Sequence, residues 1–378
     1  MKKEVMSPER LAASLAIPDL TDPKNGIHAI NLVVYNILQA LENAYIRATI
    51  EEVRANPEVS VKENFDDLLF PIDNLGRSSR YTRYVTSGTV LRTHTSAAIP
   101  SWLKKVAQSG VDDAIVVLPG ICYRRDVVDK IHCGEPHQMD VWRVNRGLPR
   151  LKRKALINLI ESVLDAVIPR SKYRANEVQH PYTINGLEVE VLVREEWLEV
   201  LECGEVHPKL LADAMLNLKE YSGLAMGIGL DRMVMILKGI DDIRILRSED
   251  PRIKRQMTNL NPYHPISKYP PICQDLSVSV SWNTNEEDIC EIIKDSLGNN
   301  ANAIEEIIIV SETPYERLPQ KAIERLGIKP DQKNMLIRVV LRSHERSLTH
   351  EEANNMRDKI YRAVDQSETG GYLGYSLK

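Results

Sequence analysis

A proline-rich segment sets the strongest limit on how this chain can fold. Four prolines, at positions 262, 265, 270 and 271, interrupt residues 259–271. Proline fixes φ and lacks a backbone N–H, so neither a long helix nor a central strand runs through such a segment. A chain of 378 residues is also long for a single core. The sequence therefore predicts two domains, residues 1–260 and 261–378.

The pattern after the prolines is regular. Strands are expected at 275–281, 304–311 and 335–343, helices at 285–297 and from the capping box Thr349–Glu352 onward, and a further strand at 371–377. Strand, helix, strand, strand, helix is the order of a ferredoxin-like α+β unit.

The first part of the chain mixes both kinds of element. Helices are expected at 26–44, 152–167, 211–219 and 231–237, and strands at 48–61 (broken at Pro57), 114–118, 187–193 and 197–201. The fold class predicted for the whole chain is α+β.

Composition excludes several classes of protein. The chain is 43% hydrophobic and 27% charged, as folded proteins are, and its formal net charge of -4 gives no global attraction for nucleic acid. An RNA partner would need a local basic surface. No apolar run approaches the ~18 residues of a membrane span, so no membrane partner is expected. Five cysteines without paired spacing indicate reduced thiols and a cytoplasmic location.

Two polar clusters precede residue 141. Residues 91–96 place His94 among three hydroxyl side chains, although spacing alone favours a simple polar turn. Residues 120–140 contain two adjacent arginines at 124 and 125, and the planar guanidinium of Arg124 suits a phosphate. An exposed hairpin with ordinary ion pairs is the alternative. A zinc site at His132, Cys133 and His137 is weakly indicated, because the spacing is irregular.

Two further clusters follow. In the strand 197–203, strict alternation places Glu199 on one face and Glu202 on the opposite face. A carboxylate such as Glu199 can hold Mg²⁺ beside nucleotide phosphates, or can simply be solvated. The glycine-rich run 223–232 permits close approach of a ligand to the backbone and ends at Arg232.

The order of these clusters resembles phenylalanine-type class II aminoacyl-tRNA synthetases. The corresponding motifs are L-R-T-H-T-S at 91–96, Y-R-R-D…H…H-Q at 123–138, W-L-E-V-L-x-C-G at 197–204 and G-x-A-x-G-x-G-x-x-R at 223–232. Residues 268–349 are similar to the family's ferredoxin-like anticodon-binding domain. The resemblance implies an antiparallel class II sheet with flanking helices, in the layout of single-chain organellar enzymes. ATP, Mg²⁺, an amino acid and tRNA are the implied ligands.

The resemblance also implies roles for individual residues. Arg124 would hold the α-phosphate and the substrate carboxylate. Arg232 would hold the γ-phosphate end or the adenine face, and His132 would hold the phosphate tail. These three residues are the catalytic candidates. Asp126 would orient the adenine side, and Glu199 would bind Mg²⁺. The residues expected at the amino-acid end are His94, Ser96, Gln138, Asp140, His180, Tyr182, Ala225 and Met226.

The departures from the family pattern fall mostly at the amino-acid end. Where the family has F-P-F, this chain has His180-Pro181-Tyr182, and Glu202 replaces the first glycine of G-C-G. Asp140 stands in place of a glutamate. We therefore expect a substrate with a polar or cationic side chain, or an amine. The alternatives are a synthetase paralogue that adenylates such a compound for a non-tRNA acceptor, and a non-catalytic RNA-binding protein.

Overall fold

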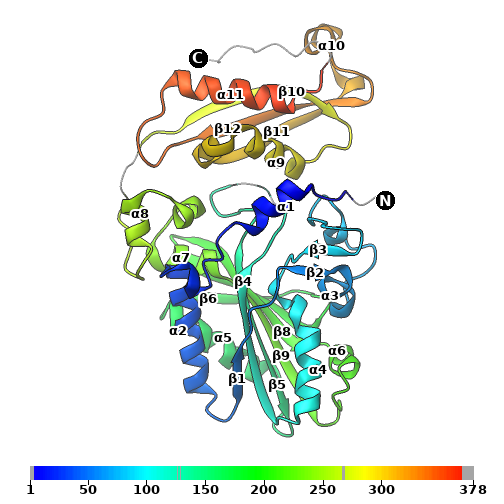
Figure 1. The fold of residues 1–378 in the computed structure, drawn as a ribbon, viewed down its shortest axis with the longest axis vertical. Helices are drawn as coiled ribbons and strands as arrows, with labels where there is room; N and C mark the ends of the chain where they lie inside the picture. Colours follow the sequence, from blue (N-terminus) through cyan, green and yellow to red (C-terminus); the bar gives the residue numbers. More distant parts are fainter. Residues whose placement is uncertain (1–3, 126, 128, 266–268, 368–378) are drawn as a thin grey trace. The chain divides into compact units, whose positions relative to one another are not determined.

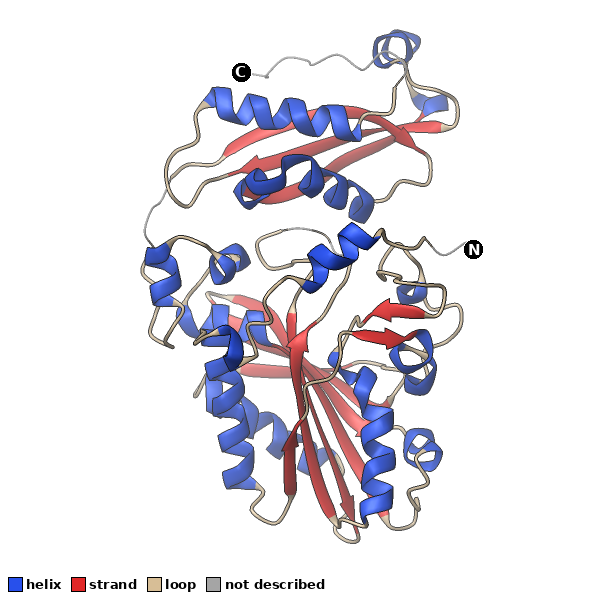
Figure 2. Cartoon of the chain, viewed as in Figure 1, coloured by secondary structure: helices blue, strands red, loops and turns tan. Residues whose placement is uncertain are grey.

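The chain forms two units, each built from helices and strands, which confirms the predicted α+β class (Figures 1 and 2). A computed structural model describes residues 4–125, 127, 129–265 and 269–367. The first unit comprises residues 1–124, 135–240 and 255–263, and the second comprises 125–134, 241–254 and 264–378. The pattern of prolines gives no hint that the internal stretches 125–134 and 241–254 belong with the C-terminal part.

The first unit is built on a seven-stranded sheet. Its order is β1 (Thr49–Glu52), β4 (Asp113–Ile121), β5 (His137–Arg146), β9 (Tyr221–Gly229), β8 (Glu196–Val206), β7 (Thr183–Val193) and β6 (Tyr173–Glu177). β1 pairs with β4 in parallel, and the remaining pairs are antiparallel, as the class II resemblance implies. A separate two-stranded sheet joins β2 (Glu58–Ser60) to β3 (Thr89–Leu91).

Helices cover the two faces of this sheet unequally. Figure 1 shows α2 (Ala29–Ala44), α5 (Arg153–Val167) and α7 (Leu230–Lys238) together, and α2 contacts both of the others. On the face that carries Trp142, α4 (Ile99–Ser109) and α6 (Pro208–Asp213) form a hydrophobic cluster. The remaining helices of the first unit are short: α1 (Pro8–Leu15) and α3 (Val61–Asn64). α4 and α6 cover only part of the face that carries Trp142, and polar side chains occupy the rest.

Two predicted elements have different limits in the structure. The strand expected to end at Leu118 continues through Pro119 and Gly120, because β5 pairs with it along its whole length. The helix expected at 211–219 is α6, which ends at Asp213, since Met215 adopts a positive φ of 67° that an α-helix does not accommodate.

A β-bulge in β8 corrects the alternation expected from the sequence. Val189 pairs with Leu201, but the next residue, Glu190, pairs with Glu199, so Val200 is an extra residue in β8. Glu188 pairs with Glu202. Paired residues share a face, and so do residues two apart in β7. Glu199 and Glu202 therefore lie on the same face, and the prediction that they lie on opposite faces was wrong.

A glycine in β4 makes room for a buried arginine. Arg92 is 3% exposed and donates hydrogen bonds to the carbonyl oxygens of Ile121 and Ala55, each at 2.9 Å. A Cβ at Gly120 would lie 2.0 Å from Arg92 Nη2. A side chain at this position would have to displace the buried Arg92 guanidinium.

The second unit contains the predicted ferredoxin-like elements. Its three-stranded antiparallel sheet has the order β10 (Ile272–Ser281), β12 (Gln332–Leu341) and β11 (Ile304–Pro314), with α9 (Glu286–Leu297) and α11 (His350–Val364) packed on its core. The Thr349–Glu352 capping box is present as expected. The sequence did not indicate α10 (Gln320–Leu326), and α8 (Pro251–Gln256) follows the first unit's α7 in the chain. The strand expected at 371–377 lies outside the described residues.

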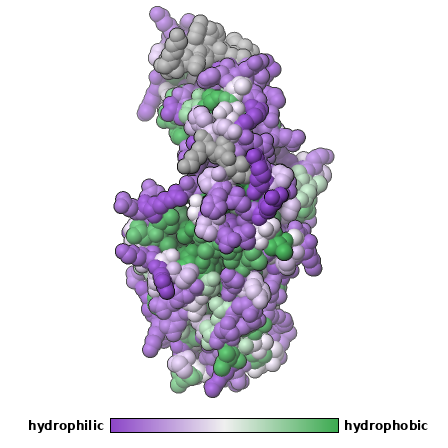
Figure 3. All heavy atoms as spheres, turned by 90° about the vertical axis from the view of Figure 1, so that its left-hand side faces the viewer, coloured by the Kyte–Doolittle hydropathy of each residue, from purple (hydrophilic) through white to green (hydrophobic). Residues whose placement is uncertain are grey.

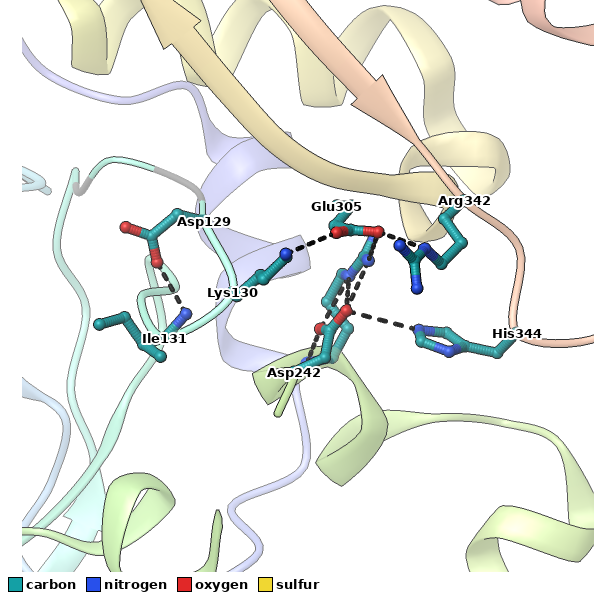
Figure 4. A network of polar contacts seen from close by, with 8 residues as sticks. Asp129, Lys130, Ile131, Asp242, Glu305, Arg342 and His344 are labelled. Atoms are coloured by element: carbon teal, nitrogen blue, oxygen red, sulfur yellow. Dashed lines mark hydrogen bonds and ion pairs between the residues drawn. The ribbon is translucent and has the colours of Figure 1, made fainter. Parts of the chain in front are cut away.

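A buried carboxylate joins separate stretches of the second unit (Figure 4). Glu305 is 3% exposed and lies 2.9 Å from Lys130 Nζ, 2.6 Å from Arg342 Nε and 3.8 Å from Arg244 Nη2. Arg244 also pairs with Asp242 at 2.6 Å. These contacts link residues 125–134 and 241–254 to the ends of β11 and β12. Arg125 adds an ion pair to Glu291 of α9.

Figure 3 shows a largely hydrophilic face with hydrophobic areas between the polar ones. Exposed apolar side chains of the first unit include Ile27, Tyr35 and Ile46. Among the helices of the described residues, none combines the length and apolar character that crossing a bilayer requires.

Gly120→Ala is expected to destabilise the first unit by about 1–3 kcal/mol, because the new Cβ must displace the buried Arg92 guanidinium. Urea unfolding measures the loss. Gly88→Ala is the matched control, since its Cβ would meet nothing within 4 Å. Equal stability of the two variants would contradict the packing argument.

Glu305→Ala is expected to destabilise the second unit by about 1–3 kcal/mol, because the partly exposed Arg342 and Lys130 lose their contacts with a shared carboxylate. Thermal unfolding reports the change. Glu306→Ala, at the half-exposed neighbouring position, serves as control. If both variants unfold at the same temperature, Glu305 is not the centre of the network.

Candidate active site

Arg124 is held in place by backbone and side-chain acceptors. Its Nε donates to the carbonyl oxygen of Thr93 at 2.7 Å, and its Nη2 donates to Oε1 of Gln138 at 3.1 Å. The same oxygen of Gln138 accepts a hydrogen bond from Cys122 Sγ at 3.3 Å. Within the described residues Nη1 has no hydrogen-bond partner, so one edge of the guanidinium is available to an anion.

Arg232 contacts Glu199 on the face of the seven-stranded sheet that also carries Asp140 and Trp142, called the site face below. Arg232 belongs to the first turn of α7, and its Nη1 donates to the carbonyl oxygen of Glu199 at 3.0 Å and to its Oε2 at 3.1 Å. The structure thus brings together the two residues predicted for the phosphates and for the metal.

The donor set fits Mg²⁺ that is shared with phosphates. Among the described residues, no group of three or more His, Cys, Asp or Glu side chains is placed to hold a metal by itself, which also removes the zinc alternative there. Mg²⁺ commonly takes one or two carboxylates and completes its shell with phosphates and water. Glu199, 40% exposed at its side chain, can supply one such ligand.

Carboxylates crowd the site face of β7 and β8. Burial raises the pKa of Glu188, and the negative charges of Glu199, Glu190 and Glu202 raise it further. Glu190 is neutralised by Arg174 at 2.6 Å. Glu188 has no hydrogen-bond or ion-pair partner among the described residues. The face therefore carries an excess of negative charge.

Asp140 is fully enclosed by donors. Its Oδ2 accepts from Thr95 Oγ1 at 2.5 Å, and its Oδ1 accepts from Trp142 Nε1 at 2.9 Å. Burial raises the pKa of Asp140 to about 6, and the two hydrogen bonds only partly offset that rise. This carboxylate orients the residues around it, because both of its oxygens are already engaged.

His94 is a neutral imidazole beside Ser96. Its Nδ1 lies 2.9 Å from Ser96 Oγ, and its ring stacks on Phe70 with centroids 5.5 Å apart. Burial, followed by the charge of Arg124, lowers the pKa of His94 to about 3. Its Nε2 is buried without a hydrogen-bond partner among the described residues, so it can receive or donate a hydrogen bond to a ligand.

An aromatic stack carries His180 and Tyr182. Tyr182 stacks on Trp142 at 5.7 Å and on His180 at 5.9 Å, and burial raises its pKa. His180 Nε2 lies 2.9 Å from Oε2 of Glu202. The two residues that replace the family pattern, His180 and Glu202, are thus in contact with each other.

Ala225 lies on the site face, but Met226 does not. Ala225 pairs with Trp142, whereas Met226 pairs with Val141 and Cys203, on the opposite face, and is 1% exposed. The expectation that Met226 lines the amino-acid end was therefore wrong, because side chains alternate along β9. The alternation of β9 instead places Gly227, two residues after Ala225, on the site face.

The chain's two phenylalanines both lie at this end of the site. Phe65 and Phe70 are edge-to-face at 5.7 Å, and Phe70 also contacts Tyr182 at 6.1 Å. Asn64 and Phe65 were not among the residues predicted for the site. Asn64 in fact fixes the 92–96 segment, since it exchanges two hydrogen bonds with Thr93. No periodic signal in the sequence pointed to Phe70.

Two predicted ATP ligands cannot be placed with the others. Asp126 lies outside the described residues. His132 belongs to residues 125–134, which group with the second unit, and its Nδ1 lies 2.7 Å from Oδ2 of Asp129. Their roles remain predictions.

Comparison with known proteins agrees with this geometry. Residues 18–257 match the family model for the tRNA synthetases class II core domain (F). The chain belongs to this family. Residues 267–370 match the ferredoxin-fold anticodon binding domain.

Curated relatives of the chain share most of its length. The chain is 30% identical over 345 residues to the chloroplastic/mitochondrial phenylalanine--tRNA ligase of Arabidopsis thaliana, which covers 88% of this chain and 75% of that protein. It is 28% identical over 367 residues to the mitochondrial enzyme of Dictyostelium discoideum, covering 80% and 76%. The phenylalanine--tRNA ligase alpha subunit of Acaryochloris marina is 32% identical over 263 residues, covering 68% and 76%. Class II synthetases in general use ATP and Mg²⁺.

The buried carboxyl of Asp140 predicts a pH-dependent stability. Its pKa rises from 3.8 to about 6 on folding, so the folded protein binds this proton more tightly than the unfolded chain does. Its contribution to stability is fully present below pH ~4 and is lost as the pH rises through about 6. The loss amounts to roughly 3 kcal/mol.

Urea unfolding at a series of pH values from about 4 to about 7 tests this expectation. Asp140→Asn cannot ionise, so its stability relative to the wild type should rise across this interval. A difference between the two proteins that stays constant with pH would contradict the raised pKa.

Proposed function

We propose that this chain activates an amino acid with ATP and transfers it to tRNA, as a phenylalanyl-tRNA synthetase-like ligase. In the first step a carboxylate oxygen of the amino acid attacks the α-phosphorus of ATP, and pyrophosphate leaves. In the second step a hydroxyl of the terminal ribose of tRNA attacks the activated carbonyl, and AMP leaves. The match of residues 267–370 to an anticodon-binding domain supports tRNA as the acceptor.

The observation that carries the proposal is the open edge of Arg124. This guanidinium is fixed by Thr93 and Gln138, and one of its nitrogens remains available. A fixed, always charged donor stabilises negative charge that develops on the α-phosphate without reorganising during the reaction. It also draws the substrate carboxylate toward the α-phosphorus, which lowers the entropic barrier to attack.

The remaining residues are assigned from the same face. Arg232 binds the γ-phosphate end or the adenine, and Glu199 holds Mg²⁺, which neutralises phosphate charge when it is bound. Gln138, Ser96 and His94 bind the polar part of the amino acid, and Asp140 positions them. Tyr182, His180 and Ala225 border its side chain. The ATP-binding roles of His132 and Asp126 remain predictions from the family resemblance.

No structural observation favours a non-tRNA acceptor or a purely RNA-binding role. A protein that only bound RNA would have no need for the fixed Arg124 or for the Arg232–Glu199 pair. The cytoplasmic location remains a prediction.

ATP–pyrophosphate exchange, run with each standard amino acid in turn, tests the proposal. Arg124→Gln is expected to lower the exchange rate by about 10²–10³, the usual effect of removing one charge-stabilising donor. Arg170→Gln removes an exposed arginine and should leave the rate unchanged. If the wild type catalyses no exchange with any amino acid, with or without tRNA, the proposed function is wrong.

A further inference from the structure

A row of three residues crosses the centre of the site face. Gly227 of β9 pairs with Asp140 of β5 on one side and with Glu202 of β8 on the other. A Cβ at Gly227 would meet nothing within 4 Å. The space above this glycine is therefore open and is flanked by two carboxylates, which neighbouring-strand spacing places about 10 Å apart at the backbone.

The two carboxylates differ in what remains available to a ligand. Both oxygens of Asp140 accept hydrogen bonds from Thr95 and Trp142. Glu202 uses one oxygen, Oε2, to contact His180. Within the described residues the other oxygen of Glu202 has no hydrogen-bond partner, and the side chain is 39% exposed. Glu202 therefore has an acceptor to offer.

The contact with His180 fixes Glu202 as an ionised acceptor. Burial favours the neutral acid, but His180 and the charges of Arg124 and Arg232 outweigh it and lower the pKa of Glu202. An ionised carboxylate only accepts hydrogen bonds, so the open oxygen of Glu202 suits a ligand group that donates one. His180 itself is held by stacking on Tyr182. The carboxylate is thus oriented as well as charged.

The surroundings leave this negative charge in excess. Glu199 is paired with Arg232 and Glu190 with Arg174, but Glu188, which pairs with Glu202 across the strands, has no partner among the described residues. A hydrocarbon side chain beside Glu202 would strip water from a charged oxygen without replacing the hydrogen bond. A side chain that donates a hydrogen bond would replace it.

We infer that the amino acid activated by this enzyme has a side chain that bears a hydrogen-bond donor, and that Glu202, oriented by His180, is the residue that selects it. The inference rests on the proposed activation reaction. Sites that hydrogen-bond a substrate group reject analogues that lack it far more sharply than hydrocarbon pockets reject a change of size. A donor such as a hydroxyl, an amine or a ring N–H meets this requirement, and phenylalanine does not.

The experiment compares kcat/KM for ATP–pyrophosphate exchange across the twenty standard amino acids in the full chain, in Glu202→Ala and in Glu196→Gln. The wild type is expected to prefer an amino acid whose side chain carries a donor. Glu202→Ala is expected to lower kcat/KM for that amino acid at least about tenfold, and to change the values for phenylalanine and leucine by less than about threefold. Glu196, exposed at the start of β8, should be neutral.

A preference of the wild type for a hydrocarbon side chain would overturn the inference. So would an equal loss for all amino acids in Glu202→Ala. If this variant does not fold, as judged by circular dichroism, Glu202→Gln keeps the shape, removes the charge and carries the same comparison.

Thermal shifts with the same amino acids separate this inference from the proposed reaction. If exchange is absent but a donor-bearing amino acid raises the Tm of the wild type and not of Glu202→Ala, the selection by Glu202 stands and the activation chemistry fails. If neither exchange nor a thermal shift is seen with any amino acid, both are wrong.

Discussion

The buried contact between His137 and Asp231 is the interaction on which the site depends. His137 begins β5, Asp231 lies in the first turn of α7, and the carboxylate accepts from the His137 backbone N–H at 2.6 Å and lies 3.1 Å from its Nδ1. The imidazole Nε2 accepts from the Leu20 N–H at 3.1 Å, which leaves the ring proton on Nδ1, facing Asp231. The next residues along the chain are Gln138 and Arg232. One buried contact thus fixes both ends of the proposed ATP site.

Charged groups at the site differ from charged groups elsewhere in how many of their polar atoms already have partners. Two buried charges away from the site have partners: Glu305 lies beside cations, and Lys238, 1% exposed, donates hydrogen bonds to three backbone carbonyl oxygens. The site face differs. Arg124 keeps an open nitrogen, and Glu202 keeps an open oxygen. The open nitrogen suits the carboxylate and phosphate groups of the reaction, and the open oxygen suits a hydrogen-bond donor on the substrate's side chain.

Much of this was predictable from the sequence, because periodicity and motif order are local properties. The helix at α2, the strands of the ferredoxin-like unit and the capping box at Thr349 follow from spacing alone. Arg124, Arg232 and Glu199 were found from the chemistry of their side chains and their order. Alternation predicted the wrong face for Glu202, because a bulge inserts one residue at Val200. The residues around Val200 give no sequence signal for this bulge. The prediction for Met226 was wrong for a different reason. β9 alternates regularly, but the motif alone did not show which of its residues face the site.

The sequence by itself determined the fold class, the kind of reaction expected and the side chains able to handle phosphate. These depend on residue types at set spacings, which are visible in the linear sequence. Only the tertiary structure decided that His180 and Glu202 touch, that Phe70 stacks on His94 and that Glu305 gathers Lys130 and Arg342. Those contacts join residues far apart in the chain. They depend on strand register, on irregularities such as those at Val200 and beside Glu305, and on how loops pack, and these are fixed only when the chain folds in three dimensions.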